Sequence, residues 1–207
     1  MIISKNQLTK LAFFIFLLAI ILPGCKTSST ENKVAKIPNI LLVLADDQSW
    51  LHTGASGNKV IKTPAFDRIA KEGVLFTNAF SACPSCTPSR TAILSGQEIW
   101  RTEEAGLLMG AIPKDLKLFT HILDDNGFFV GYTGKGWAPG NWDYLGLEKE
   151  PLIKEYNSRL EKEIAYGIDK RNYTANFKDF LNDRPENSPF FFWFGSTEPH
   201  REYQFGV

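Results

Sequence analysis

The sequence lacks an excess of charge of either sign, and this absence excludes one broad class of partner. Its 207 residues carry 23 Lys and Arg side chains against 23 Asp and Glu side chains, so the formal net charge is zero. Because electrostatic binding to nucleic acid needs a basic patch or stripe, we expect no nucleic-acid partner. Hydrophobic residues make up 43% of the chain and charged residues 22%, which favours a folded globular protein over a disordered one.

Cysteines and long apolar runs are also scarce. The chain has three cysteines, Cys25, Cys83 and Cys86. Three is an odd number and too few for a disulfide-stapled scaffold, so each cysteine needs its own explanation. The apolar run at residues 11–22 follows Lys5 and Lys10. It is shorter than the roughly 20 residues that a membrane-spanning helix needs, and it suits the apolar core of a signal peptide.

Cys25 follows this apolar run and is interpreted as a lipid-attachment site. Leu22, three residues before it, and Gly24, immediately before it, resemble the lipobox of bacterial lipoproteins. We therefore predict a signal peptide of the lipoprotein type over residues 1–24 and a polar tether over residues 25–36. The expected product is an exported bacterial protein, held on a membrane in the periplasm or at the cell surface. An ordinary secretory signal with an incidental cysteine is the alternative.

The remainder of the chain alternates short apolar runs with helical patterns. This alternation predicts an α/β fold with a mostly parallel sheet sandwiched by helices. Residues 39–45 are apolar after the first residue, as in a strand that is covered on both faces. The further predicted strands are residues 74–80, 128–132 and 189–194, and the predicted helices are 63–71, 88–94, 116–125 and 173–181.

Three polar clusters directly follow predicted strands. They are Asp46-Asp47, Gly134-Lys135 and the run from Glu198 to Arg201. In open α/β sheets, ligands bind outside the carboxyl ends of the strands, so these clusters can converge on one crevice.

Residues 83–96 read Cys-Pro-Ser-Cys-Thr-Pro-Ser-Arg-Thr-Ala-Ile-Leu-Ser-Gly. The stretch from Cys86 to Arg90 resembles the C-x-P-S-R signature of the type I sulfatases, which belong to the alkaline phosphatase superfamily. The resemblance runs from about Pro38 to the last residue. It implies a hydrolase of sulfuric esters or sulfamates, with a sulfated glycan as substrate. It also implies that a formylglycine-generating maturation enzyme oxidises Cys86 to formylglycine, whose hydrated aldehyde is the nucleophile.

The chemistry of sulfate esters suits these residue types. The negative charge of the ester repels nucleophiles, so a site must supply positive charge and an oxygen nucleophile in line with the leaving group. A hydrated aldehyde supplies one hydroxyl for attack on sulfur and a second whose deprotonation expels sulfate. Position 86 also lies near the start of a predicted helix, where backbone N–H groups and the helix dipole favour anions.

The resemblance assigns roles to the residues of the three clusters. Asp46, Asp47 and Cys86 are expected to hold one divalent cation, Ca²⁺, because carboxylates are the hard oxygen ligands that Ca²⁺ prefers. Arg90 and Lys135 are expected to be catalytic cations. His200 is expected to transfer a proton or to bind the sulfate, since a histidine can serve either role near neutral pH.

The second family motif differs here. Many sulfatases have Lys-Trp-His, but this chain has Lys135-Gly136-Trp137, with tryptophan in the place of the histidine. The run from Gly134 to Gly140, together with Glu198-Pro199-His200-Arg201, resembles the heparan N-sulfatase (sulfamidase) branch, whose substrate is N-sulfoglucosamine. The residues expected to bind substrate are Glu198, Arg201, Trp137 and His52.

Three alternatives remain at the level of sequence. Cys83-Pro84-Ser85-Cys86 is also a C-x-x-C sequence, which would make Cys86 a redox or disulfide residue. Phosphoester and phosphonate monoester hydrolases can share C-x-P-S-R, and a glycan-binding pseudoenzyme fits the absent histidine. The family is also longer and takes further metal ligands from its C-terminal half. We therefore expect residues 37–207 to be the N-terminal part of a catalytic domain, with the C-terminal part missing and little activity on its own.

Overall fold

The computed structural model describes residues 37–201. The predicted signal peptide, the tether and Cys25 lie outside these residues. Across residues 37–201, none of the helices combines the length and the apolar character that crossing a membrane would require.

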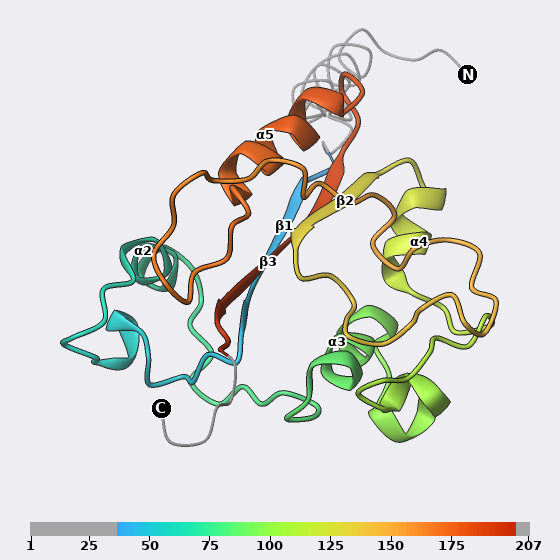
Figure 1. Cartoon of the computed structure of the whole chain (residues 1–207), viewed down its shortest axis with the longest axis horizontal. Coiled ribbons are helices and arrows are strands. Elements are labelled where there is room, and N and C mark those ends of the chain that lie inside the picture. The colour runs from blue at the N-terminus through green and yellow to red at the C-terminus, as the bar shows by residue number, and fades with distance from the viewer. Residues whose placement is uncertain (1–36, 202–207) are drawn as a thin grey trace, which may run out of the picture. The chain divides into compact units, whose positions relative to one another are not determined.

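The described chain is built on a parallel sheet of three strands (Figure 1). Strand β1 spans Ile40–Asp46, β2 spans Phe129–Gly134 and β3 spans Phe190–Pro199, and β3 lies between the other two. All three strands run in the same direction. Their carboxyl ends therefore meet at one edge of the sheet, where Asp46 pairs with Pro199 and Gly134 pairs with Gly195.

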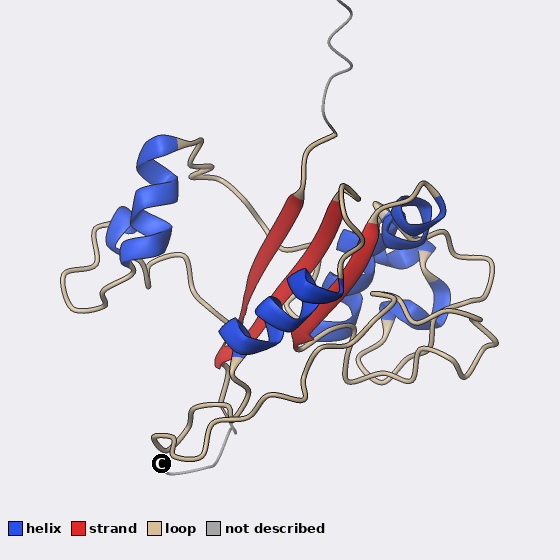
Figure 2. Cartoon of the chain, turned by 90° about the horizontal axis from the view of Figure 1, so that it is seen from above, coloured by secondary structure: helices blue, strands red, loops and turns tan. Residues whose placement is uncertain are grey.

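The central strand β3 supplies apolar side chains to both faces of the sheet. Phe191 and Trp193 belong to a core shared with Leu94, Leu118 and Val130, on the side of helices α3 (Cys86–Ser95) and α4 (Phe119–Asp125). The alternate residues pack on the other face with Phe180 of helix α5 (Tyr173–Asp183), and they are Phe190, Phe192 and Phe194. Because side chains alternate along a strand, one aromatic run fills both layers. Figure 2 shows helices on both faces of the strands, which confirms the predicted α/β fold.

The remaining helices lie in the segment between β1 and α4. Helix α2 spans Pro64–Glu72, and proline at its first position already has the backbone angle of a helix. Short 3₁₀ helices span Gly54–Ser56, Ile99–Arg101 and Glu103–Gly106. Asp67 of α2 accepts a hydrogen bond from the backbone N–H of Ala55, which holds α2 against the first of them.

One predicted strand is absent. Residues 74–80 form no strand, and Val74, Phe76 and Phe80 are largely exposed. The apolar pattern of this segment suggested a strand, but no strand among residues 37–201 pairs with it. Hydrophobic pattern alone does not make a strand, because its backbone groups need a partner at the edge of a sheet.

Strand β1 has an open edge. It pairs only with β3 among the described strands, and Leu41 and Val43 remain 49% and 58% exposed. Its apolar composition predicted a strand covered on both faces, and residues 37–201 do not supply that cover.

Candidate active site

Asp46, the last residue of β1, is the hub of the polar site. It is only 4% exposed, and its carboxylate accepts a hydrogen bond from Nη2 of Arg90 at 3.1 Å and from Nζ of Lys135 at 2.6 Å. Burial alone would raise the pKa of Asp46, but the hydrogen bond and charge of Lys135, helped by Arg90, outweigh burial and lower the pKa. Asp46 is therefore an anion at neutral pH.

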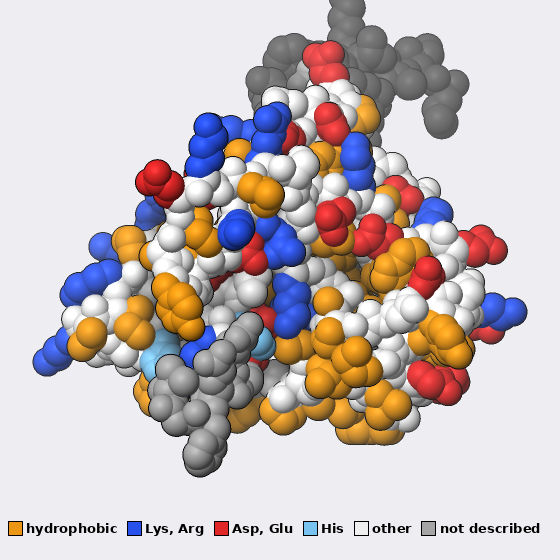
Figure 3. Space-filling model, in the orientation of Figure 1, with side chains coloured by type: hydrophobic (Ala, Val, Ile, Leu, Met, Phe, Trp, Pro, Cys, Tyr) orange, Lys and Arg blue, Asp and Glu red, His pale blue; other side chains and the backbone are white. Residues whose placement is uncertain are grey.

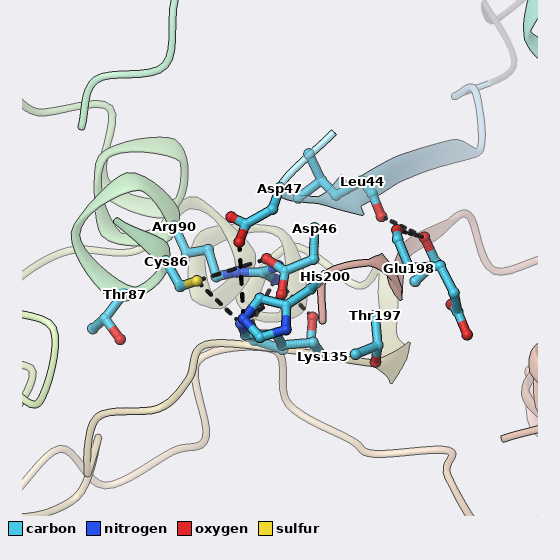
Figure 4. Close-up of polar contacts among 12 residues, drawn as sticks. Leu44, Asp46, Asp47, Cys86, Thr87, Arg90, Lys135, Thr197, Glu198 and His200 are labelled. Atoms are coloured by element: carbon cyan, nitrogen blue, oxygen red, sulfur yellow. Dashed lines mark hydrogen bonds and ion pairs between the residues drawn. The ribbon is translucent and has the colours of Figure 1, made fainter. Parts of the chain in front are cut away.

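Cys86 is the first residue of helix α3, two residues earlier than the helix start predicted from Pro88. Its Sγ atom lies 3.7 Å from Oδ1 of Asp46 and accepts a hydrogen bond from Nζ of Lys135 at 3.1 Å. At this end of the helix, the backbone N–H groups of Cys86 and Thr87 and the helix dipole favour negative charge. Figure 4 shows Cys86, Asp46 and Lys135 pointing toward one another.

The guanidinium of Arg90 is held by backbone carbonyl groups on one side and by the carboxylate of Asp46 on the other. It lies one turn after Cys86 on α3 and is 5% exposed. Its Nη1 atom donates to the carbonyl oxygens of Lys135 and Gly136 at 2.7 and 2.9 Å, while Nη2 bonds Asp46. The guanidinium also lies over the ring of Trp193, 5.7 Å from its centroid. Arg90 thus ties α3 to the ends of β1 and β2.

Lys135 is the residue after β2, at a point where the backbones of β2 and β3 lie very close together. Its backbone N–H donates to the carbonyl of Gly195 at 2.7 Å, and Gly134 has a φ of +78°. A Cβ atom at Gly134 would overlap the carbonyl oxygen of Gly195. Glycine is therefore required here both for its backbone angle and for the close approach of β3.

We expect Gly134→Ala to destabilise the fold more than alanine at a glycine with the same backbone angle. Gly127 has a φ of +84°, and a Cβ atom there meets nothing within 4 Å. Gly127→Ala should cost about 1 kcal/mol for the backbone angle alone. Gly134→Ala should cost roughly 2 kcal/mol more, because the backbone of β3 must move. Urea unfolding of both variants measures the difference, and equal losses would show that the contact with Gly195 is relaxed at little cost.

Asp46, Cys86 and Arg90 open into one cavity of about 790 Å³, whereas Lys135 lines a second, smaller cavity of about 350 Å³. The lining of the larger cavity includes Asp46, Asp47, Cys83, Cys86 and Arg90. Figure 3 shows acidic, basic and histidine side chains gathered near the middle of this face. The crevice predicted at the carboxyl edge of the sheet is therefore present, and it is large enough for a sugar-sized ligand.

Asp46, Asp47 and Cys86 fit the predicted cation site in geometry and in chemistry. One ligand atom from each lies within 4.8 Å of the other two. Asp47 has a φ of +59°, a left-handed conformation that aspartate tolerates better than most residues. Two carboxylates suit a hard divalent cation, and in this structure the Lys135 ammonium already lies among these atoms.

His200 lies beside Asp47, with Nε2 3.8 Å from Oδ2 of the carboxylate. The pairing of Asp46 with Pro199 across β1 and β3 places it there. The structure therefore brings together six residues predicted from the sequence, which are Asp46, Asp47, Cys86, Arg90, Lys135 and His200 (Figure 4).

The residues predicted to bind substrate are less closely associated with the cavity. Trp137 is 6% exposed and its indole N–H donates to Oγ1 of Thr91, so it is a core residue in this structure and its role in substrate binding stays a prediction. Glu198 has both carboxylate oxygens bonded to protein groups, on Asp169 and Tyr173. His52 and Arg201 are exposed and do not line the cavity.

The structure also identifies residues that the sequence did not. Trp193 donates its indole N–H to the carbonyl of Lys135 and stacks under Arg90, so it supports two catalytic candidates at once. Its only signal was membership of the apolar strand.

Cys83 and Cys86 are both free thiols, and Cys86 contacts Asp46 and Lys135, so the disulfide alternative has no support here.

Comparison with known proteins agrees with this geometry. A family model described as Sulfatase matches residues 38–205. An ulvan-active sulfatase of Formosa agariphila is 47% identical over 126 residues, which cover 60% of this chain and 25% of that protein. An N-acetylgalactosamine-6-O-sulfatase of Bacteroides thetaiotaomicron is 32% identical over 191 residues, which cover 80% of this chain and 37% of that protein.

Solved structures are also similar to this chain. A structure determined with its substrate D-glucosamine-2-N,6-O-disulfate aligns with a TM-score of 0.60 and 25% identity, over 81% of this chain and 35% of that one. The chain spans between 18% and 37% of the length of the curated relatives it matches. With the family model covering residues 38–205 and the signature cysteine in the shared cavity, the chain belongs to the sulfatase family.

Proposed function

We propose that the protein hydrolyses sulfate esters or sulfamates on a sulfated glycan. The observation that carries the proposal is the convergence of Cys86 with two carboxylates, the buried Arg90 and the part-buried Lys135 at one helix start. Three similar proteins support the glycan, namely the ulvan-active sulfatase, the N-acetylgalactosamine-6-O-sulfatase and the protein solved with its substrate D-glucosamine-2-N,6-O-disulfate. A heparan-type N-sulfoglucosamine substrate is the finer proposal, from Glu198-Pro199-His200-Arg201.

Two groups that the chain alone does not contain complete this site. Formylglycine made from Cys86 would supply a hydrated aldehyde as the oxygen nucleophile, and Asp46, Asp47 and residue 86 would hold one Ca²⁺ that withdraws negative charge from the sulfate. A formylglycine-generating enzyme is therefore a proposed partner. From the predicted signal peptide and Cys25, we further propose that the protein is exported and anchored to a membrane.

The chain's own residues would orient and neutralise the sulfate group. Lys135 projects its ammonium to within 3.1 Å of Sγ of residue 86, so it can bind a sulfate oxygen placed there. Arg90 neutralises Asp46 and orients the backbone of Lys135, and the N–H groups of the first turn of α3 add fixed dipoles that require no reorganisation during the reaction. His200, through Nε2, would give a proton to the leaving oxygen of the sugar.

The proposed function is tested with the full-length gene product coexpressed with a formylglycine-generating enzyme. Peptide mass spectrometry of residues 83–90 reports whether Cys86 is converted. Sulfate and phosphate release from matched aryl esters, and sulfate release from heparan-type and galactosamine-type oligosaccharides, then define the reaction. Sulfate release that exceeds phosphate release supports the proposal. Faster phosphate release would assign a phosphoester hydrolase, and glycan binding without hydrolysis would assign a pseudoenzyme.

We expect Asp47→Asn to weaken Ca²⁺ binding in a way that is measurable without activity. A bound cation stabilises the folded state by an amount that grows with the ratio of its concentration to its Kd. Loss of one carboxylate charge should therefore remove most of the rise in Tm that millimolar CaCl₂ gives the parent protein. Asp143→Asn, at an exposed position outside the cavity, is the control. An unchanged Ca²⁺ response in Asp47→Asn would place the cation elsewhere.

A further inference from the structure

Glu198 closes a hydrogen-bond network between the end of β3 and the segment that leads into α5. Its Oε1 accepts from the backbone N–H of Asp169 at 2.8 Å, and its Oε2 accepts from the hydroxyl of Tyr173 at 3.0 Å. Glu198 is part-buried, like both partners. A carboxylate whose two oxygens are already bonded to protein is poorly available to substrate, and its charge would repel a sulfate group.

The same two partners also hold the residue before Glu198. The Tyr173 hydroxyl accepts from the backbone N–H of Thr197 at 3.1 Å, and Oδ2 of Asp169 accepts from the Thr197 hydroxyl at 3.2 Å. Arg171 fixes Asp169 in turn, with a guanidinium contact of 2.6 Å. Thr197 and Glu198 are thus bound by four hydrogen bonds to residues 169 and 173.

This network reaches His200 through the backbone. The N–H of His200 donates to the carbonyl of Thr197 at 3.0 Å, so the position of Thr197 sets the position of His200. On the opposite side, β1 contributes the pairing of Asp46 with Pro199. The imidazole of His200 consequently lies at Asp47 because the turn from Thr197 to His200 is held from both sides.

We propose that Glu198 is a positioning residue for His200, which revises the substrate-binding role predicted from the sequence. The proposal rests on the proposed function for the role of His200, but the network itself does not depend on which ester is hydrolysed. Removing the Glu198 carboxylate should release the backbone N–H of Asp169 and the Tyr173 hydroxyl, and should allow the turn that carries His200 to move.

The kinetic test compares Glu198→Ala and Glu198→Gln in the full-length gene product, with Glu186→Ala at an exposed position as the control. A displaced proton donor acts on the chemical step, so Glu198→Ala should lower kcat about tenfold or more and leave KM within about twofold. Glu198→Gln should recover most of kcat, because its amide oxygen still accepts from Asp169 and its amide N–H can donate to Tyr173. A raised KM with unchanged kcat would overturn the proposal and restore a substrate-binding role.

A second measurement does not depend on turnover. In protein labelled with ¹³C at Cε1 of histidine, the His200 signal is assigned from its loss in His200→Gln and is followed at fixed pH. Glu198→Ala and Tyr173→Phe should both shift or broaden this signal, while Glu186→Ala leaves it in place. If the protein hydrolyses no sulfate ester, the proposed function fails, but a shifted His200 signal still supports the positioning role. An unmoved His200 signal in both variants overturns it.

Discussion

Cys86→Ala is expected to abolish sulfate release, with kcat/KM falling by at least about 10⁴-fold in the full-length protein coexpressed with the maturation enzyme. Alanine cannot be converted to formylglycine, so the proposed nucleophilic oxygen would be lost while Lys135 and Arg90 remain. The residual rate would then come from binding and charge alone. Initial rates on an aryl sulfate, together with peptide mass spectrometry of residues 83–90, measure the effect.

Two companion variants make this result specific. Cys83→Ala should keep most of the activity, because Cys83 lines the cavity but contacts none of Asp46, Lys135 or Arg90 in the hydrogen bonds of the site. Cys86→Ser should accept sulfate once and then stop, since a serine has no second hydroxyl to expel the sulfate group. Full turnover by Cys86→Ala would refute the role of position 86, whatever the state of the other residues.

Arg90→Met is expected to have the largest effect on stability, with a loss of about 3 kcal/mol or more in the free energy of unfolding. The reason is that Asp46 would remain buried with only Lys135 to compensate it. In addition, the carbonyl of Gly136 would lose its donor, and that of Lys135 would keep only the indole N–H of Trp193. Urea unfolding without added metal measures the loss.

The exposed pair of Arg159 and Asp179 provides the matched control. Nε and Nη2 of Arg159 bond Asp179 at 2.6 and 3.1 Å, but the Arg159 side chain is 61% exposed. Arg159→Met should barely change the midpoint of unfolding, because water and salt screen such a pair. The double variant Arg90→Met/Asp46→Asn should be more stable than Arg90→Met alone, since it removes the uncompensated charge. Similar losses in Arg90→Met and Arg159→Met would mean that burial adds nothing to the Arg90 contacts.

The parts of the fold that were predictable from the sequence are those in which an apolar segment also has a neighbouring strand to pair with. The apolar run at residues 189–194 predicted a strand, and it forms most of β3 at the centre of the sheet. Residues 74–80 have a similar apolar character and form no strand. The difference between them is the presence of a neighbouring strand, and a hydrophobic pattern does not reveal which strands will pair.

The residues of the site also fall into a predictable group and an unpredictable group. Cys86 was predictable because the stretch that it begins resembles the sulfatase signature. Asp46 and Lys135 were predictable because they lie at the ends of predicted strands, and parallel strands bring those ends together. The contacts of Trp137 and Glu198 were not predictable, because they depend on which way a side chain points and on what it bonds. Thr91 lies 46 residues from Trp137 along the chain, and Asp169 lies 29 residues from Glu198. Contacts over such separations are set by packing, which a linear motif does not encode.

The open edge of β1 has a consequence for handling this polypeptide. Within residues 37–201, no strand pairs with the side of Ile40–Asp46 away from β3, and Leu41 and Val43 are exposed beside it. Natural proteins usually blunt such a border with charge, proline or a bulge, and the six residues Ile40–Ala45 contain neither charge nor proline. Two molecules can therefore join border to border by adding strands to each other's sheets. Concentrated preparations should accordingly show growing light scattering unless the border is capped.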